Sequence, residues 1–284
     1  MRPAPEPNDV IKLAVGAKRA SPLQLSTWEA ILAEIIIGDA FGADRMDYLL
    51  RDSYHAGVTY GTYDHHRLIS TLRILQKTYE ETDEPALGLE AGGLESSEGL
   101  MLARHFMYKQ VYFHNIRRIY DIHLKEFLRN WLPGGRFSTD IQKHLAISDS
   151  HVLATIRSDF FDTTSPRYKL ARRLLCREHF KRFYEASQTD AAGGKLQPGK
   201  AIADAAIEEF GQDNIRYDYA GPKSIAPVFP VLKFDKAIEP SHQCSQVLAK
   251  MPQILVDNVY CEGNIRNNAI RWKDENKNRL LQLG

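Results

Sequence analysis

Residues 38–57, "GDAFGADRMDYLLRDSYHAG", place four acids, two arginines, two tyrosines and a histidine in barely five helical turns. The spacing predicts a helix from about Ala43 to Tyr54, with Gly57 as its stop. One face of that helix would carry two acids, a phenol and an imidazole: Asp44, Tyr48, Asp52 and His55. The apolar residues point elsewhere and can pack: Met46, Leu49 and Leu50.

Two interpretations of this face remain open on periodicity alone. It can be a solvated surface with local ion pairs, such as Asp47 with Arg51 at i, i+4. It can also be a binding face, in which a carboxylate ligates a hard metal ion while the tyrosine and second acid hold a hydroxylated substrate.

The bulk composition excludes several classes of protein. The chain has 284 residues, 43% of them hydrophobic, and a formal net charge of +1. It can therefore bury a large core, and its charge gives no global argument for nucleic acid or an anionic membrane. Three scattered cysteines without a CxxC pattern favour a reducing compartment: Cys176, Cys244 and Cys261. With no signal-like apolar segment and no run long enough to span a bilayer, we expect a cytoplasmic protein without a membrane partner.

The chain is expected to be mainly α, with a helical body and a small C-terminal α+β subdomain. The expected parts are an irregular proline-rich segment at 1–22, the helical body at 23–188 and the α+β part at 189–284. The first helix should begin near Ser26, because "STWE" is a capping box. Further helices are expected at 64–76, 95–132, 139–145, 149–158, 168–186, 199–210, 241–250 and from 264, and strands at 87–90, 214–220, 228–234 and 257–262.

Long ordered blocks of the sequence resemble the HD-domain phosphohydrolases, and within them the dNTP triphosphohydrolases. The pattern D-[KR]-x-D-Y-x-x-R-D-x-x-H-x-G runs from Asp44 to Gly57, and "YDHHRLISTLRI" follows it. Residues 94–124 look like the long helix that supplies phosphate and sugar contacts. Residues 171–185, "ARRLLCREHFKRFYE", are similar to the segment that follows the HD domain. The resemblance covers most of the chain from residue 9 onward. It implies a reaction in which metal-activated water releases a deoxynucleoside and triphosphate from a dNTP, in a homo-oligomer.

The resemblance implies a metal site made of a histidine, a consecutive His-Asp pair and a distant aspartate. Asp44 matches that aspartate. None of the 43 residues before it is a histidine, and none of the ten histidines is followed by aspartate. One carboxylate does not hold a catalytic divalent ion, whether Mg, Mn, Fe or Zn. We therefore expect this chain alone to lack the family's hydrolytic activity, as a truncated product, as half of a split enzyme completed by another chain, or as a binding protein derived from an enzyme.

The other implied site residues would bind deoxynucleotides. Arg45 and Arg104 match phosphate-binding residues. Tyr48, Asp52 and Tyr112 match residues that hold the deoxyribose, with Asp52 accepting from the 3′-hydroxyl and Tyr112 excluding a ribose 2′-hydroxyl. Arg67 resembles a contact to a regulatory nucleotide. The alternatives are a surface salt bridge for Arg104 and a packed helix tyrosine for Tyr112.

The histidines of these blocks are not expected to bind metal. His114 and His123 do not match members of the tetrad. Adjacent residues on a helix point about 100° apart, so His65 and His66 should cap the helix or face solvent rather than share one ion.

A competing function is suggested by residues 165–184, where seven Lys and Arg accompany one Glu. Arg173, Arg177 and Lys181 recur every four residues, and three aromatic residues are interleaved with them. A basic helical stripe of this kind can bind a nucleic-acid backbone. The alternatives are an amphipathic helix whose arginines pair with acidic neighbours, and a regulatory nucleotide site at a subunit interface.

Overall fold

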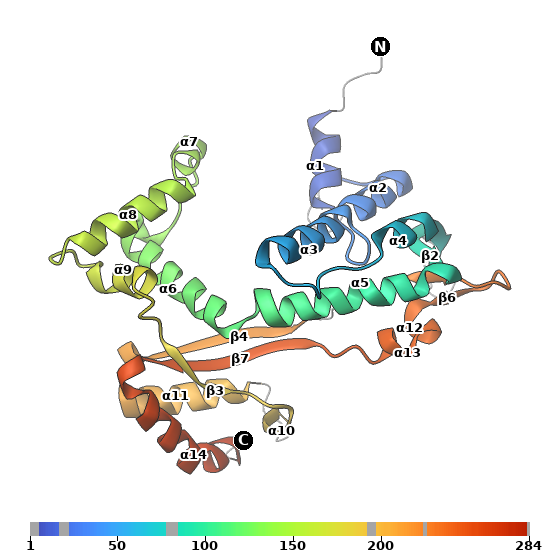
Figure 1. The fold of residues 1–284 in the computed structure, drawn as a ribbon. Coiled ribbons are helices and arrows are strands. Elements are labelled where there is room, and N and C mark those ends of the chain that lie inside the picture. Colours follow the sequence, from blue (N-terminus) through green and yellow to red (C-terminus); the bar gives the residue numbers. More distant parts are fainter. Residues whose placement is uncertain (1–5, 17–22, 78–84, 192–196, 224–225, 283–284) are drawn as a thin grey trace. The chain divides into compact units, whose positions relative to one another are not determined.

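The structure is a computed structural model that describes residues 6–16, 23–77, 85–191, 197–223 and 226–282 (Figure 1). The chain is mainly helical with small sheets, which confirms the expected fold class. It divides into two compact units. The first unit comprises Met1–Val111 and Lys223–Ile254, and the second comprises Tyr112–Pro222 and Leu255–Gly284. The chain passes between the units after residues 111, 222 and 254.

The first unit contains most of the helices expected before residue 112. Its helices are α1 (Pro7–Val15), α2 (Thr27–Ile37), α3 (Ala43–Ala56), α4 (His65–Thr71), η1 (Ala91–Gly93), α5 (Leu94–Met107), α12 (Ser241–Cys244) and α13 (Gln246–Ala249). The capping box at Ser26 is confirmed, because its hydroxyl accepts from the amide of Glu29, whose carboxylate accepts in return at 2.7 Å. The segment 1–22, expected to be irregular, contains the helix α1. Pro7 does not prevent this helix, because a proline is tolerated in the first turn. The helix expected at 241–250 is two short helices.

A four-stranded sheet completes this unit. Its strands are β1 (Leu72–Gln76), β2 (Pro85–Glu90), β5 (Pro230–Leu232) and β6 (Ile238–Pro240), in the order β1-β2-β5-β6. β1 and β2 are antiparallel, with Leu72 opposite Leu89, while β2 and β5 are parallel. The helix expected at 64–76 is therefore wrong beyond Thr71, because residues 72–76 form the edge of this sheet.

The second unit combines a helical part with a three-stranded sheet. Its helices are α6 (Asn115–Trp131), η3 (Pro133–Gly135), α7 (Ile141–Leu145), α8 (Asp149–Phe161), α9 (Tyr168–Leu175), α10 (Gln188–Ala191), α11 (Pro198–Phe210), η4 (Gln212–Asn214), η5 (Gly263–Ile265) and α14 (Arg266–Gln282). β7 (Ile254–Cys261) lies between β3 (Lys181–Glu185) and β4 (Ile215–Lys223). The sheet and its helices share one buried core that includes Phe183, Ile202, Ala206, Val259 and Ala269.

Two long predicted helices are interrupted. The helix expected at 95–132 ends at Met107, passes through the π-helical turn η2 (Tyr108–Tyr112) and restarts as α6. His114 caps the restart, since its Nδ1 accepts from the amide of Ile116. The helix expected at 168–186 ends at Leu175, and Arg177 has a φ of 57°. The strand β3 that follows pairs with β7, so tertiary pairing overrides the local helical spacing.

Candidate functional site

The helix α3 has a buried side and a polar side. Met46, Leu49 and Ser53 are buried on one side. On the other side Asp44 is exposed in the first turn, while Tyr48 and Asp52 are half-buried. The prediction that the apolar residues point away from the polar face is therefore confirmed for Met46 and Leu49. His55 at the end of the helix is exposed and lies edge-on to Tyr54.

Arg45 is held by the end of the preceding helix. Its Nη1 donates to the carbonyl oxygens of Ile37 at 2.6 Å and Gly38 at 2.8 Å. Its Nη2 lies 2.7 Å from a carboxylate oxygen of Asp39. Because α2 ends at Ile37, the guanidinium satisfies carbonyls that have no partner inside that helix and offsets the negative end of its dipole.

Arg104 on α5 reaches the same loop. Its side chain is buried, with the residue 3% exposed, and its Nη1 donates to the backbone carbonyl of Asp39 at 2.8 Å. The guanidinium also lies 6.0 Å from the centre of the Tyr108 ring. The resemblance assigns Arg45 and Arg104 to phosphate, and both bind Asp39. Arg45 binds the Asp39 side chain, and Arg104 binds the Asp39 backbone carbonyl.

Tyr48 lies within reach of both arginines. Burial and a hydrogen bond with Tyr108 raise the pKa of the Tyr48 hydroxyl, while the charges of Arg104 and Arg45 act in the opposite direction. Tyr48 therefore stays protonated at neutral pH and can donate as well as accept a hydrogen bond. Asp52, one turn further along α3, lies 4.0 Å from Nε of Arg51.

Arg67 on α4 binds residues other than Arg45, Tyr48 and Arg104. Its backbone amide is capped by Asp64, and its Nε donates to the carbonyl of Gly92 at 3.0 Å. His65 and His66 have ring centres 4.1 Å apart on the same turn.

Tyr112 begins the second unit at the end of the π-helical turn, and its carbonyl accepts from Arg117. It is half-buried. The structure therefore brings together Arg45, Tyr48 and Arg104 within the first unit, whereas Tyr112 belongs to the other unit.

The described residues do not form a metal site around Asp44. Across residues 6–16, 23–77, 85–191, 197–223 and 226–282, no three His, Cys, Asp or Glu side chains lie together in a way that could hold an ion. A single exposed carboxylate does not fit a catalytic divalent metal, which needs three or more protein ligands.

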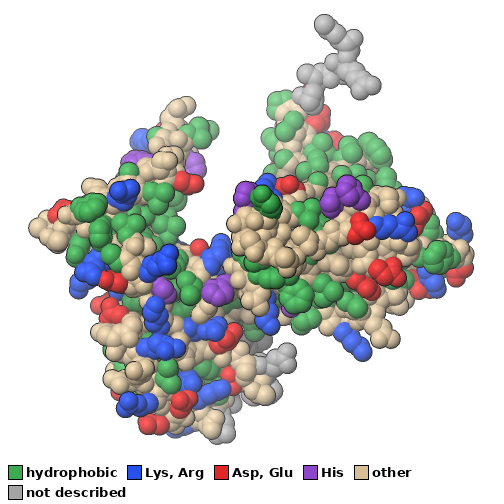
Figure 2. Space-filling model, in the orientation of Figure 1, with side chains coloured by type: hydrophobic (Ala, Val, Ile, Leu, Met, Phe, Trp, Pro, Cys, Tyr) green, Lys and Arg blue, Asp and Glu red, His purple; other side chains and the backbone are tan. Residues whose placement is uncertain are grey.

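The basic residues of the second unit do not form a helical stripe. α9 ends before Arg177, and Lys181 lies on β3. Arg173 lies 3.7 Å from Glu126 and 3.8 Å from Glu262, so it pairs with acidic neighbours. On the face seen in Figure 2, Lys and Arg side chains of this unit are interspersed with Asp and Glu. Arg177 and Lys181 therefore do not continue a helical stripe from Arg173, and the alternative in which the arginines pair with acidic neighbours describes Arg173.

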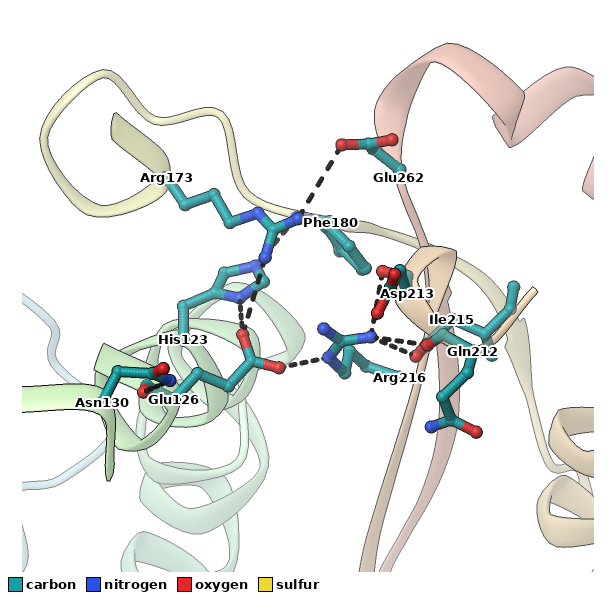
Figure 3. A network of polar contacts seen from close by, with 10 residues as sticks. All are labelled: His123, Glu126, Asn130, Arg173, Phe180, Gln212, Asp213, Ile215, Arg216 and Glu262. Atoms are coloured by element: carbon teal, nitrogen blue, oxygen red, sulfur yellow. Dashed lines mark hydrogen bonds and ion pairs between the residues drawn. The ribbon is translucent and has the colours of Figure 1, made fainter. Parts of the chain in front are cut away.

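A polar network surrounds Phe180 in this unit (Figure 3). The carboxylate of Glu126 binds Nδ1 of His123 at 3.1 Å and also pairs with Arg216. The guanidinium groups of Arg173 and Arg216 lie 4.5 and 5.1 Å from the centre of the Phe180 ring. His123 is thus part of a packed core.

A cavity of about 500 Å³ opens beside this network. Among its lining residues, three carry a positive charge and none a negative one: Lys181, Arg182 and Arg266. Burial and the charge of Lys181 lower the pKa of His179, which also lines the cavity, so its imidazole is neutral at pH 7. The lining is therefore positive, although Arg182 also pairs with Glu185 at 2.8 Å.

Sequence reasoning missed Asp39, Tyr108 and the partners of His123. Asp39 lies between two glycines in a loop, where no periodicity marks it. Tyr108 has the spacing of a continuing helix, and Glu126 meets Arg216 only after the chain has folded. No local pattern signals these contacts.

Comparison with known proteins places the chain among HD-associated sequences. The family model described as the HD associated region matches residues 63–210. The uncharacterized protein MJ1154 of Methanocaldococcus jannaschii is 44% identical over 92 residues, which are 32% of this chain and 19% of that protein. The uncharacterized protein YwfO of Bacillus subtilis is 34% identical over 93 residues, 33% of this chain and 20% of that protein. The match thus spans about a fifth of each relative.

Two solved structures share the fold. A hypothetical protein from Aquifex aeolicus superimposes with a TM-score of 0.74 and 29% identity, covering 93% of this chain and 63% of that one. A phosphohydrolase, BT4208, from Bacteroides thetaiotaomicron gives a TM-score of 0.60 at 17% identity, covering 89% of this chain and 66% of that one. At this identity the second likeness shows the fold alone. Among the described residues, no helix combines the length and apolar character that a membrane crossing requires.

Proposed function

From the premise that the chain belongs to the HD associated region family, we propose that it forms the phosphate- and sugar-binding side of an HD-type phosphohydrolase site for deoxynucleoside triphosphates. One observation carries this proposal. Arg45 and Arg104, which are assigned to phosphate and come from different helices, both bind Asp39, at 2.7 and 2.8 Å, and Tyr48, assigned to the sugar, lies one turn along α3 from Arg45. A solvated helix face with only local pairs would not need this convergence.

The residues have distinct roles in this proposal. The guanidinium groups supply planar donors for phosphate oxygens. The protonated hydroxyl of Tyr48 and the carboxylate of Asp52 hold the deoxyribose, with Asp52 accepting from the 3′-hydroxyl. The resemblance assigns Tyr112, which belongs to the second unit, to exclusion of a ribose 2′-hydroxyl, and Arg67 to a regulatory nucleotide.

The chemistry of the reaction requires more than these residues. Asp44 is the one member of the family's four-ligand metal set in this sequence, and the described residues do not complete a site around it. We propose that residues 1–284 alone do not hydrolyse dNTPs, and that a complete site takes its His and His-Asp ligands, whether for Mg, Mn, Fe or Zn, from outside these residues. A homo-oligomer and a cytoplasmic location are further parts of the proposal.

Calorimetry with purified protein tests the binding role. We expect a dNTP to bind more tightly than its 2′,3′-dideoxy analogue, and Asp52→Asn to remove most of that difference. Asp47→Asn, on the same helix but paired with Arg51 at 2.7 Å, is the matched control and should preserve it. If wild-type protein binds neither nucleotide, the proposal is wrong. Release of triphosphate from a dNTP by the chain alone with Mn²⁺ would contradict the proposed inactivity.

A second candidate function is supported by the cavity of the second unit. Its lining of Lys181, Arg182 and Arg266 favours an anionic ligand, either a nucleotide or a nucleic-acid backbone. Anisotropy with a single-stranded oligonucleotide at low and high salt separates the two, because backbone binding weakens steeply with salt. An affinity that hardly changes would contradict nucleic-acid binding, and Lys181→Gln should weaken either ligand more than Lys125→Gln, a change on the exposed side of α6.

A further inference from the structure

We propose that Asp39 is an internal competitor for the phosphate site, because its carboxylate holds the guanidinium of Arg45 until a polyphosphate displaces it. This inference rests on the proposed function, since it concerns one of the same arginines. It adds a residue to which neither the sequence pattern nor the resemblance gives a role.

The geometry is that of an anion already bound. Nη2 of Arg45 lies 2.7 Å from Oδ1 of Asp39, which is the distance expected between a guanidinium and an oxyanion. A carboxylate and a phosphate compete for the same planar donors. The structure therefore places an internal oxyanion at one of the two arginines.

Exposure makes the exchange feasible. The Asp39 side chain is 69% exposed, whereas that of Arg45 is 24% exposed. The carboxylate can therefore turn into water without losing hydration, and the guanidinium remains anchored by the carbonyls of Ile37 and Gly38. An exposed ion pair of this kind is weak, so a triphosphate with several charges can replace it.

The backbone of the loop need not move during this exchange. Arg104 donates to the carbonyl of Asp39 at 2.8 Å, which holds the main chain independently of the side chain. Rotation of the Asp39 side chain is then sufficient to uncover Arg45. A ligand that displaces Asp39 must offset the lost Asp39–Arg45 ion pair and the repulsion from the Asp39 carboxylate, which stays nearby. A polyphosphate carries enough charge to do so, whereas inorganic phosphate carries less and should bind more weakly.

The test compares tripolyphosphate binding by wild-type protein and Asp39→Asn, measured by calorimetry at low ionic strength. The amide keeps the shape of the side chain but removes its charge, so we expect about three- to tenfold tighter binding. Asp47→Asn makes the same change in net charge at an exposed acid on α3 and should change affinity less than about twofold. Circular dichroism and a thermal melt establish that each variant is folded.

The outcomes separate this inference from the proposed function. If wild-type protein binds tripolyphosphate and Asp39→Asn binds it equally well, Asp39 is not a competitor, while the phosphate site stands. If both aspartate variants gain affinity equally, the effect is general electrostatics and the inference is also overturned. If neither wild-type protein nor Asp39→Asn binds, the phosphate site itself is refuted.

Discussion

The backbone amide of Phe180 donates to Nε2 of His123 at 3.1 Å, and this bond sets the tautomer of a completely buried histidine. Because Nε2 accepts, the proton of the neutral ring lies on Nδ1, which donates to Glu126. The His123 side chain on α6 therefore satisfies the amide of the residue before β3 and orients the Glu126 carboxylate of the network in Figure 3.

Removing this histidine should destabilise the protein strongly. His123→Ala leaves the Phe180 amide without its acceptor and creates a cavity, so we expect the free energy of unfolding to fall by about 2–4 kcal/mol. Urea denaturation measures the change. His144→Ala, at an exposed position on α7, should cost less than about 0.5 kcal/mol. Similar losses in the two variants would show that the buried bonds of His123 contribute little.

The Glu126 network should make stability depend on pH in the acid range. Burial opposes ionisation of Glu126, but hydrogen bonds from His123 and Arg216 outweigh it, so the pKa is lowered from its usual 4.5. A carboxyl whose pKa is lower in the folded than in the unfolded state stabilises the folded protein. This stabilisation is complete above the pKa of the unfolded state and is lost as the pH falls through the pKa of the folded state. The stability gap between wild-type protein and Glu126→Gln should therefore be constant from about pH 7 to pH 5 and shrink below about pH 4.5. A gap that widens on acidification would contradict this assignment.

Gly199 should not tolerate a side chain. A Cβ at this position in the first turn of α11 would lie 2.0 Å from Oδ1 of the buried Asp257, whose other carboxylate oxygen accepts from the Gly199 amide at 2.9 Å. We expect Gly199→Ala to lower the free energy of unfolding by at least about 2 kcal/mol. Gly263→Ala, where no atom lies within 4 Å of the added Cβ, is the control and should be nearly neutral in the same thermal or urea melts. A fully stable Gly199→Ala variant would show that Asp257 can move aside.

Arg104 should rigidify the loop between α2 and α3. Arg104→Met removes the charged donor to the Asp39 carbonyl, so amide hydrogen exchange at residues 38–42 should become faster by about tenfold. Mass spectrometry of peptic peptides measures this exchange. Arg51→Met removes an exposed arginine from α3 and should leave the loop unchanged. Equal protection of the loop in wild-type and Arg104→Met protein would refute the clamp.

Much of the fold could be predicted because the information is local. The capping box at Ser26 and the helix stop at Gly57, which has a φ of 67°, involve only residues that are close in sequence. The strands β1 and β3 could not be predicted, because each forms by pairing with residues outside its own segment. The spacing of residues 64–76 and 168–186 is compatible with a helix until that pairing is known.

The candidate site shows the same division. The common face of Asp44, Tyr48 and Asp52 follows from helical geometry, and the structure reproduces it. Arg45 and Arg104 both bind Asp39 because α5 contacts a loop that is distant in sequence. The spacing of residues along the chain does not predict such a contact. The roles of these residues toward nucleotides remain predictions.

The parallel pairing of β5 with β2 has a consequence for biosynthesis. Residues 1–111 belong to the first unit and residues 112–222 to the second. The chain then returns to the first unit, where it forms β5 and β6, before β7 and α14 follow in the second unit. On the ribosome, β2 therefore lacks its parallel neighbour until β5, residues 230–232, has been synthesised, and β7 follows later still. The first unit stays incomplete over that interval, so a chaperone that shields the edge of β2 during synthesis should raise the yield of native protein more than one that acts after release.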